Sequence, residues 1–131
     1  LAHPEGYELE PVALDAARRF AADCGGRFSI THDMHAAFRD ADVVYPKSWA
    51  PAWVMRQRTP LLRANDRAGL VDLERQCLAH NARHTDWTCD ADAMARTRGG
   101  AAHYLHCLPA DVTDLSCASG EVSRAVSMPD A

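Results

Sequence analysis

The chain has 131 residues, the length of one domain with an ordinary hydrophobic core, which excludes two full domains. Its 47% hydrophobic and 24% charged residues are typical of a globular protein and exclude disordered, collagen-like and membrane classes. The 14 basic and 18 acidic side chains give a formal net charge of -4, which argues against nucleic acid as a partner.

No run of about 20 apolar residues and no leader-like start is present, so we expect a cytoplasmic protein with no membrane partner. Its 5 scattered cysteines do not resemble the framework of a secreted disulfide-rich domain, and we interpret them as reduced thiols. The chain begins at Leu1 without a methionine and ends abruptly at Ala131, so we expect it to be a piece of a longer protein.

The first part of the chain alternates strand and helix patterns. Residues 1–3 resemble the end of a strand, and residues 11–24 have a proline at the start, apolar residues at helical spacing and two glycines just after the end. A strand over 27–31, a short helix over 33–40 and a strand over 42–45 follow. This order predicts an α/β fold with a parallel, Rossmann-like sheet and flanking helices.

Residues 46–60 contain three prolines and two tryptophans, which predicts an excursion away from the sheet. A helix over 61–83, a shorter helix over 90–98 and a strand over 102–107 follow. Ligands of open α/β sheets bind outside the carboxyl ends of the strands, so the segments after Tyr45 and after His106 are the expected walls of a binding site.

The loop after the strand that ends at Tyr45 carries Lys47, Ser48 and Trp49 between two prolines. Lys47 is the only lysine of the chain, and a cation, a hydroxyl and an aromatic ring on a rigid loop could together hold an anion. The alternative, an exposed lysine beside a packed tryptophan, stays open.

The other strand end carries His106, Cys107, Leu108 and Pro109. Adjacent residues on a strand point to opposite faces, which argues against a Cys-His nucleophile pair. The imidazole could donate to a polarised carbonyl, whereas the plainest alternative is an ordinary buried strand end. Dinucleotide, P-loop and nucleophile-elbow motifs are absent from the sequence.

The spacing of Cys77, His80, His84 and Cys89 superficially suits tetrahedral zinc. Histidines are also common on the surfaces of alanine-rich helices. We therefore predict no metal site, and keep a zinc-stabilised domain only as a weak alternative.

Residues 106–109 at a strand end, with residues 40–45 leading into a tryptophan-containing loop, resemble the second-substrate domain of the aspartate/ornithine carbamoyltransferases. The resemblance covers nearly the whole chain and is closest to the knotted, YgeW-type carbamoyltransferases. It implies that residues 1–131 are part of an Asp/Orn-binding domain and that the carbamoyl-phosphate domain is absent.

The resemblance implies an enzyme that, at full length, transfers the carbamoyl group of carbamoyl phosphate to an amine, with active sites between the subunits of a trimer and no cofactor. It places His106 near the carbamoyl group, and the carbonyls of Cys107 and Leu108 against the attacking amine, held by a cis bond to Pro109. The family's S-x-R-T-R phosphate motif does not occur in this sequence, so we expect the chain alone to be inactive.

The ornithine enzymes have an aspartate where this chain has Lys47, and the resemblance implies that their aspartate faces the free α-ammonium group of the acceptor. A lysine there would repel that ammonium group. We therefore expect an acceptor other than free ornithine, with a carboxylate or an acylated amine at this position. The alternative is a non-catalytic module of the same fold that binds a small acid.

Overall fold

The computed structural model describes residues 1–47, 50–107 and 126. Four of the predicted site residues, Ser48, Trp49, Leu108 and Pro109, lie outside these ranges, as does the expected cis bond to Pro109. Lys47, His106 and Cys107 lie within them. No helix in the described ranges is long and apolar enough to cross a membrane.

Two parallel strand pairs confirm the α/β prediction. The first is a single bridge between Ala2 and Thr31, with hydrogen bonds from the Thr31 amide to the Leu1 carbonyl and from the His3 amide to the Thr31 carbonyl. The second joins β1 (Val43–Val44) to β2 (His103–Tyr104), in the register Val43 to His103 and Val44 to Tyr104. The paired segments are much shorter than the strands predicted over 27–31, 42–45 and 102–107.

Helix α1 (Pro11–Asp23) confirms the helix predicted over 11–24. Proline occupies its first turn, and Gly25, at a φ of 70°, ends it in the left-handed region that favours glycine. Helices α2 (Met34–Phe38) and α5 (Ala91–Ala95) are shorter than predicted, and the 3-10 turn η1 (Arg98–Gly100) follows α5. Asp33 and Asp90 cap α2 and α5 by accepting a hydrogen bond from an amide three residues on.

Two of the predicted element boundaries are wrong. Helix α3 (Ala52–Arg63) occupies most of residues 46–60, where no helix was predicted, and Pro60 lies inside it. Helix α4 (Arg67–Asn81) begins only after a sharp turn, so residues 61–83 are not one helix. The turn consists of Asn65, with a φ of 51°, and Asp66, whose carboxylate accepts a hydrogen bond from the amide of Gly69 at 2.9 Å.

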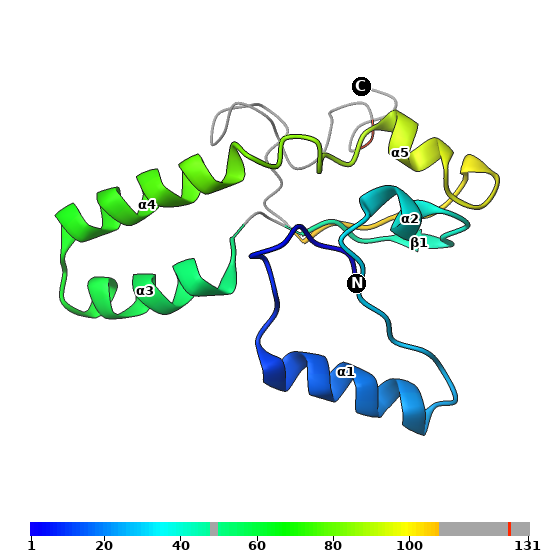
Figure 1. The fold of residues 1–131 in the computed structure, drawn as a ribbon, viewed down its shortest axis with the longest axis horizontal. Coiled ribbons are helices and arrows are strands. Elements are labelled where there is room, and N and C mark those ends of the chain that lie inside the picture. The colour runs from blue at the N-terminus through cyan, green and yellow to red at the C-terminus, as the bar shows by residue number, and fades with distance from the viewer. Residues whose placement is uncertain (48–49, 108–125, 127–131) are drawn as a thin grey trace.

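Figure 1 shows the helical hairpin of α3 and α4 projecting from the strands, with α2 and α5 on one side of the strands and α1 on the other. The main core cluster lies between β1, α2 and α5, and contains Phe38, Val44, Cys89 and Ala93. Helix α1 has no buried residue: Val12 is 77% and Phe20 63% exposed. The described chain is therefore packed on the α2 and α5 side and open on the α1 side.

Candidate functional site

The carboxyl ends of β1 and β2 lie side by side, as predicted from the parallel order. The amide of Leu105 donates to the carbonyl of Val44 at 2.9 Å. Two residues further along, the thiol of Cys107 contacts the carbonyl of Pro46, with a sulfur to oxygen distance of 4.0 Å. These contacts bring the segment that carries Lys47 next to the segment that carries His106.

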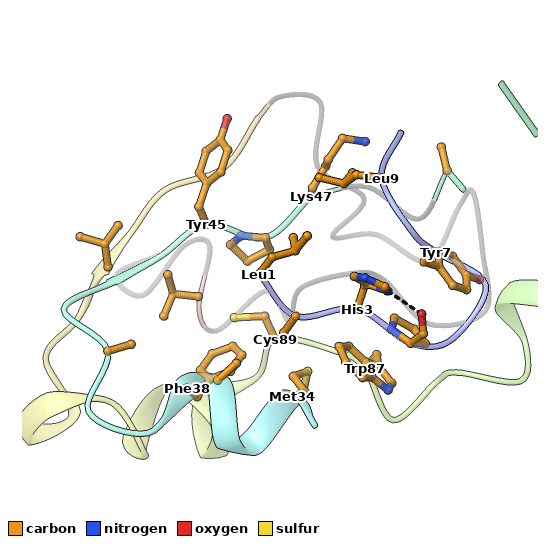
Figure 2. A pocket seen from close by; sticks show the side chains of 18 residues that line it. Leu1, His3, Tyr7, Leu9, Met34, Phe38, Tyr45, Lys47, Trp87 and Cys89 are labelled. Carbon is orange, nitrogen blue, oxygen red and sulfur yellow. Dashed lines mark hydrogen bonds between the residues drawn. The ribbon is translucent and has the colours of Figure 1, made fainter. Parts of the chain in front are cut away.

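A cavity of about 370 Å³ opens beside these strand ends. Lys47 and Leu9 line the cavity, and Figure 2 shows both on the side opposite Phe38 and Met34. Lys47 is exposed, and no carboxylate in the described ranges forms an ion pair with it. The rim near Lys47 therefore presents a positive charge that no described acidic residue neutralises.

His106 and Cys107 turn in different directions. The ring of His106 stacks on Tyr104, with ring centroids 6.1 Å apart, and both its nitrogens are enclosed by protein. The thiol of Cys107 faces Pro46 instead. This arrangement agrees with the sequence argument against a Cys-His nucleophile pair.

A second group of side chains, which we call the Tyr7 cluster, fixes the loop that follows the first strand. The Tyr7 hydroxyl donates to Oδ1 of Asn81, a residue that is only 7% exposed. The Tyr7 ring stacks on His80 with centroids 5.0 Å apart, and meets His84 edge-on at 5.4 Å. Trp53 closes the cluster by packing edge-on against His80 at 5.9 Å. One loop, α3 and α4 are thereby held together beside the cavity, which Tyr7 also lines.

Burial controls the ionisation of this cluster. Desolvation, reinforced by the charge of Cys77, raises the pKa of Tyr7 to about 12, so the hydroxyl remains a hydrogen-bond donor at neutral pH. Desolvation also lowers the pKa of His80, with smaller contributions from His84 and Arg83. His80 is therefore held toward its neutral form, which suits a ring that stacks on Tyr7 and meets Trp53 edge-on.

Residues 1–130 match the family of the aspartate/ornithine carbamoyltransferases, in its Asp/Orn binding domain. The chain belongs to this family. It is 56% identical, over 126 residues and 96% of its length, to a protein of Escherichia coli K12 that carries the provisional name carbamoyltransferase YgeW. It is also 36% identical, over 81 residues and 58% of its length, to the N-acetylornithine carbamoyltransferase of Xylella fastidiosa Temecula1.

Solved structures of the same family share the fold. An acetylornithine transcarbamylase complexed with acetylcitrulline matches with a TM-score of 0.69 and 26% identity, over 98% of this chain and 31% of that one. A variant of N-acetyl-L-ornithine transcarbamylase, complexed with carbamyl phosphate and N-succinyl-L-norvaline, gives the same TM-score and identity, over 98% of this chain and 32% of that one. The chain spans less than a third of the length of these curated relatives: 32% of the Escherichia coli protein and 23% of the Xylella fastidiosa protein.

The residues of the zinc alternative are divided between two places in the described structure. Cys89 is 3% exposed and lies in the core cluster with Phe38, whereas His80 and His84 lie in the Tyr7 cluster. Within the described ranges, no three His, Cys, Asp or Glu side chains are grouped so that they could hold a metal ion. Cys89 therefore lies apart from the two histidines, although the four residues have a regular spacing in the sequence.

The sequence argument did not identify the contribution of residues 1–9 to the site. His3, Tyr7 and Leu9 line the cavity, and the His3 carbonyl accepts a hydrogen bond from His32, the two atoms being 2.8 Å apart. The rule that directs attention to the ends of β1 and β2 applies equally to the strand that contains Ala2. Applied there, it would have indicated the loop that carries Tyr7.

Proposed function

We propose that this chain is the acceptor-binding half of a longer carbamoyltransferase, and that its acceptor carries a carboxylate or an acylated amine at the position where ornithine has its free α-ammonium group. The family match supports the first part. A single observation carries the second part: Lys47 is an exposed cation that lines the cavity, and no carboxylate of the described residues forms an ion pair with it. The rest of the polypeptide supplies the site for carbamoyl phosphate, and the complete enzyme is a cytoplasmic homotrimer with a knotted chain.

In the proposed reaction the nitrogen of the acceptor attacks the carbamoyl carbon of carbamoyl phosphate. A carbon to nitrogen bond forms, the bond from that carbon to the phosphate oxygen breaks, phosphate leaves and the nitrogen loses a proton. His106, whose ring nitrogens are enclosed by protein in this chain, turns toward the carbamoyl oxygen and donates to it when carbamoyl phosphate is bound in the complete enzyme. The carbonyls of Cys107 and Leu108 accept from the attacking amine and are oriented by Pro109. Ser48 and Trp49 complete the acceptor side with Lys47. The chemistry is mainly positioning, which in favourable geometry supplies several kcal/mol.

The names of the structural relatives support the acceptor class. The ligands in these complexes, acetylcitrulline and N-succinyl-L-norvaline, both carry an N-acyl group. Acylation removes the positive charge of an α-amine, so such a molecule can approach Lys47 without the repulsion that a free ornithine would meet. A succinyl group would add a carboxylate that Lys47 could bind.

The test uses the full-length polypeptide with carbamoyl phosphate, and compares ornithine with N-acetylornithine and N-succinylornithine as acceptors by phosphate release. We expect kcat/KM to be higher for one of the two acylated acceptors than for ornithine. Phosphate release with ornithine but with neither of the acylated acceptors would contradict the acceptor assignment. Binding of an acylated acceptor without any phosphate release would favour the non-catalytic small-acid module.

Lys47→Asp should shift the ratio of kcat/KM values toward ornithine by roughly tenfold or more. The reason is that the side chain at position 47 would then attract the α-ammonium group of ornithine instead of repelling it. Lys47→Gln should give a smaller shift in the same direction. Arg27→Gln is the matched control, since Arg27 is an exposed cation at the opposite, amino-terminal end of the strand segment near Thr31. If the unchanged protein and all three variants have the same acceptor preference, the role of Lys47 is refuted.

A further inference from the structure

His80 of α4 contacts both helix α3 and the loop of residues 4–9, which we call loop 4–9. Its ring stacks on Tyr7 with centroids 5.0 Å apart, and meets Trp53 of α3 edge-on at 5.9 Å. Its Nε2 atom lies against the backbone of Gly6, since a Cβ atom placed on that glycine would be 3.3 Å from it. His80 therefore supports loop 4–9 at two consecutive residues.

These contacts suit a neutral imidazole. Within the part of the chain that the structure describes, Nε2 of His80 is buried and has no hydrogen-bond partner. The amide of Gly6 is already used, because it donates to Oε1 of Glu8 at 3.0 Å. A neutral ring can carry its proton on the other nitrogen, whereas a protonated ring would bury an N–H donor and a positive charge against Gly6 without an acceptor.

The groups near His80 on its own helix also oppose its protonation. Desolvation lowers the pKa of His80, and the charges of His84 and Arg83 lower it further. The ring centroids of the two histidines are 5.6 Å apart. Tyr7 and Cys77 supply no compensating negative charge at neutral pH, because burial raises the pKa of Tyr7 to about 12 and also raises that of Cys77.

The elements packed against His80 do not neutralise it either. From α3 the ring meets the uncharged Trp53, while Arg56 of the same helix is paired with Glu10 at 3.1 Å. From loop 4–9 the nearest engaged carboxylate is that of Glu8, which accepts from the Gly6 amide. Among the described residues, no carboxylate forms an ion pair with His80.

Loop 4–9 is also a wall of the cavity. Pro4, Tyr7 and Leu9 line it, and Figure 2 shows Leu9 on the same side as Lys47. His80 does not line the cavity itself. Its only route to a bound acceptor is therefore through the loop, and a change in its contacts with Tyr7 would move the wall of the proposed acceptor site.

We infer that His80 is a positioning residue, whose neutral ring holds loop 4–9 in the place that acceptor binding requires. Protonation charges the ring beside His84 and Arg83, disturbs its fit against Gly6 and Tyr7, and loosens the loop. Acceptor binding then weakens as the pH falls. The transfer step is unaffected, because the residues proposed for it lie at 106–109. The inference rests on the proposed acceptor site.

The first test measures phosphate release by the full-length polypeptide at pH 7.5 and 5.5, with saturating carbamoyl phosphate and N-acetylornithine as the acceptor. His80→Gln keeps a polar side chain that cannot be protonated in this range. We expect the rise in KM for N-acetylornithine between the two pH values to be roughly threefold or more larger in the unchanged protein than in His80→Gln. The ratio of kcat values should be the same in both.

His35→Gln is the matched control, since His35 is an exposed histidine on α2 that does not line the cavity. This variant should keep the pH dependence of the unchanged protein. An equal pH dependence of KM in the unchanged protein and in His80→Gln would overturn the inference. So would a loss in His80→Gln that appears in kcat and not in KM.

Hydrogen exchange tests the same inference without catalysis. The amides of Gly6 and Tyr7 are hydrogen-bonded within the loop, and their protection relative to the unfolded chain is compared at the two pH values. We expect protection to fall roughly threefold or more at pH 5.5 in the unchanged protein and not in His80→Gln, while the amides of α1 report that both are folded. Equal protection at both pH values would overturn the inference. Phosphate release with no acceptor at all would contradict the proposed function, and the exchange result would still decide the role of His80.

Discussion

The hydrogen bond from Tyr7 to Asn81 links the loop at the cavity to helix α4, and Tyr7→Phe removes only this bond. The ring and its stack on His80 are retained. Asn81 is 7% exposed, so water cannot fully replace the lost hydroxyl, and a buried acceptor left without a partner costs about 1 to 3 kcal/mol. The amide of Asn81 also interacts with Cys77, but as a donor that lowers the pKa of the thiol, so this contact leaves Oδ1 without a partner and we expect a loss within that range.

The assay is the urea midpoint of the full-length protein, together with the KM for the acceptor. Tyr45→Phe is the matched control, since Tyr45 lines the same cavity but is 60% exposed. We expect Tyr7→Phe to lower the free energy of unfolding and raise KM, because the loop that carries Tyr7 is loosened beside the rim. Equal stability of the two variants would refute the reasoning.

Two further predictions follow from ionisation. Because burial lowers the pKa of His80, the unfolded chain binds a proton more readily than the folded one, so stability should be full above pH 6.5 and fall as the pH drops below it. His80→Gln should reduce the difference between urea midpoints at pH 7.5 and 5.5, and an unchanged difference would contradict this. Burial raises the pKa of Cys89 from 9.0 to about 11, so its alkylation at pH 8 should be roughly 100-fold slower in the folded protein than in denaturant. Peptide mapping would detect this, and a Cys89 that reacts equally fast in both would show that it is not in the core.

The parts of the fold that follow from local sequence were predicted correctly. Pro11 and the glycines after Cys24 mark both ends of α1, and the alternation of strand and helix patterns gives the parallel pairs. The break between α3 and α4 was also present in the sequence, since Asn65 tolerates the left-handed region and Asp66 is a favoured cap. Pro60 misled the prediction, because proline usually ends a helix but here lies within the last turn of α3.

The site depends on contacts that sequence patterns cannot supply. Tyr7 and Asn81 are 74 positions apart and share no motif, so only the fold brings them together. Cys77, His80, His84 and Cys89 suggested a common site because their spacing gives only the distance along the chain and not the direction in which the chain turns. The turn after α4 separates Cys89 from the histidines and directs it into the core. By contrast, the proximity of the strand ends at Pro46 and Cys107 was predictable, because it follows from parallel order alone.

The most direct test of the carbamoyltransferase assignment follows the carbamoyl carbon from carbamoyl phosphate to the product. The full-length polypeptide is incubated with carbamoyl phosphate labelled at its carbon and with an N-acylated diamino acid, and the products are separated. The account predicts one labelled ureido product formed for each phosphate released, and none when the acceptor is omitted. An acceptor that binds, as detected by calorimetry, while the label stays in carbamoyl phosphate or its breakdown products would contradict it.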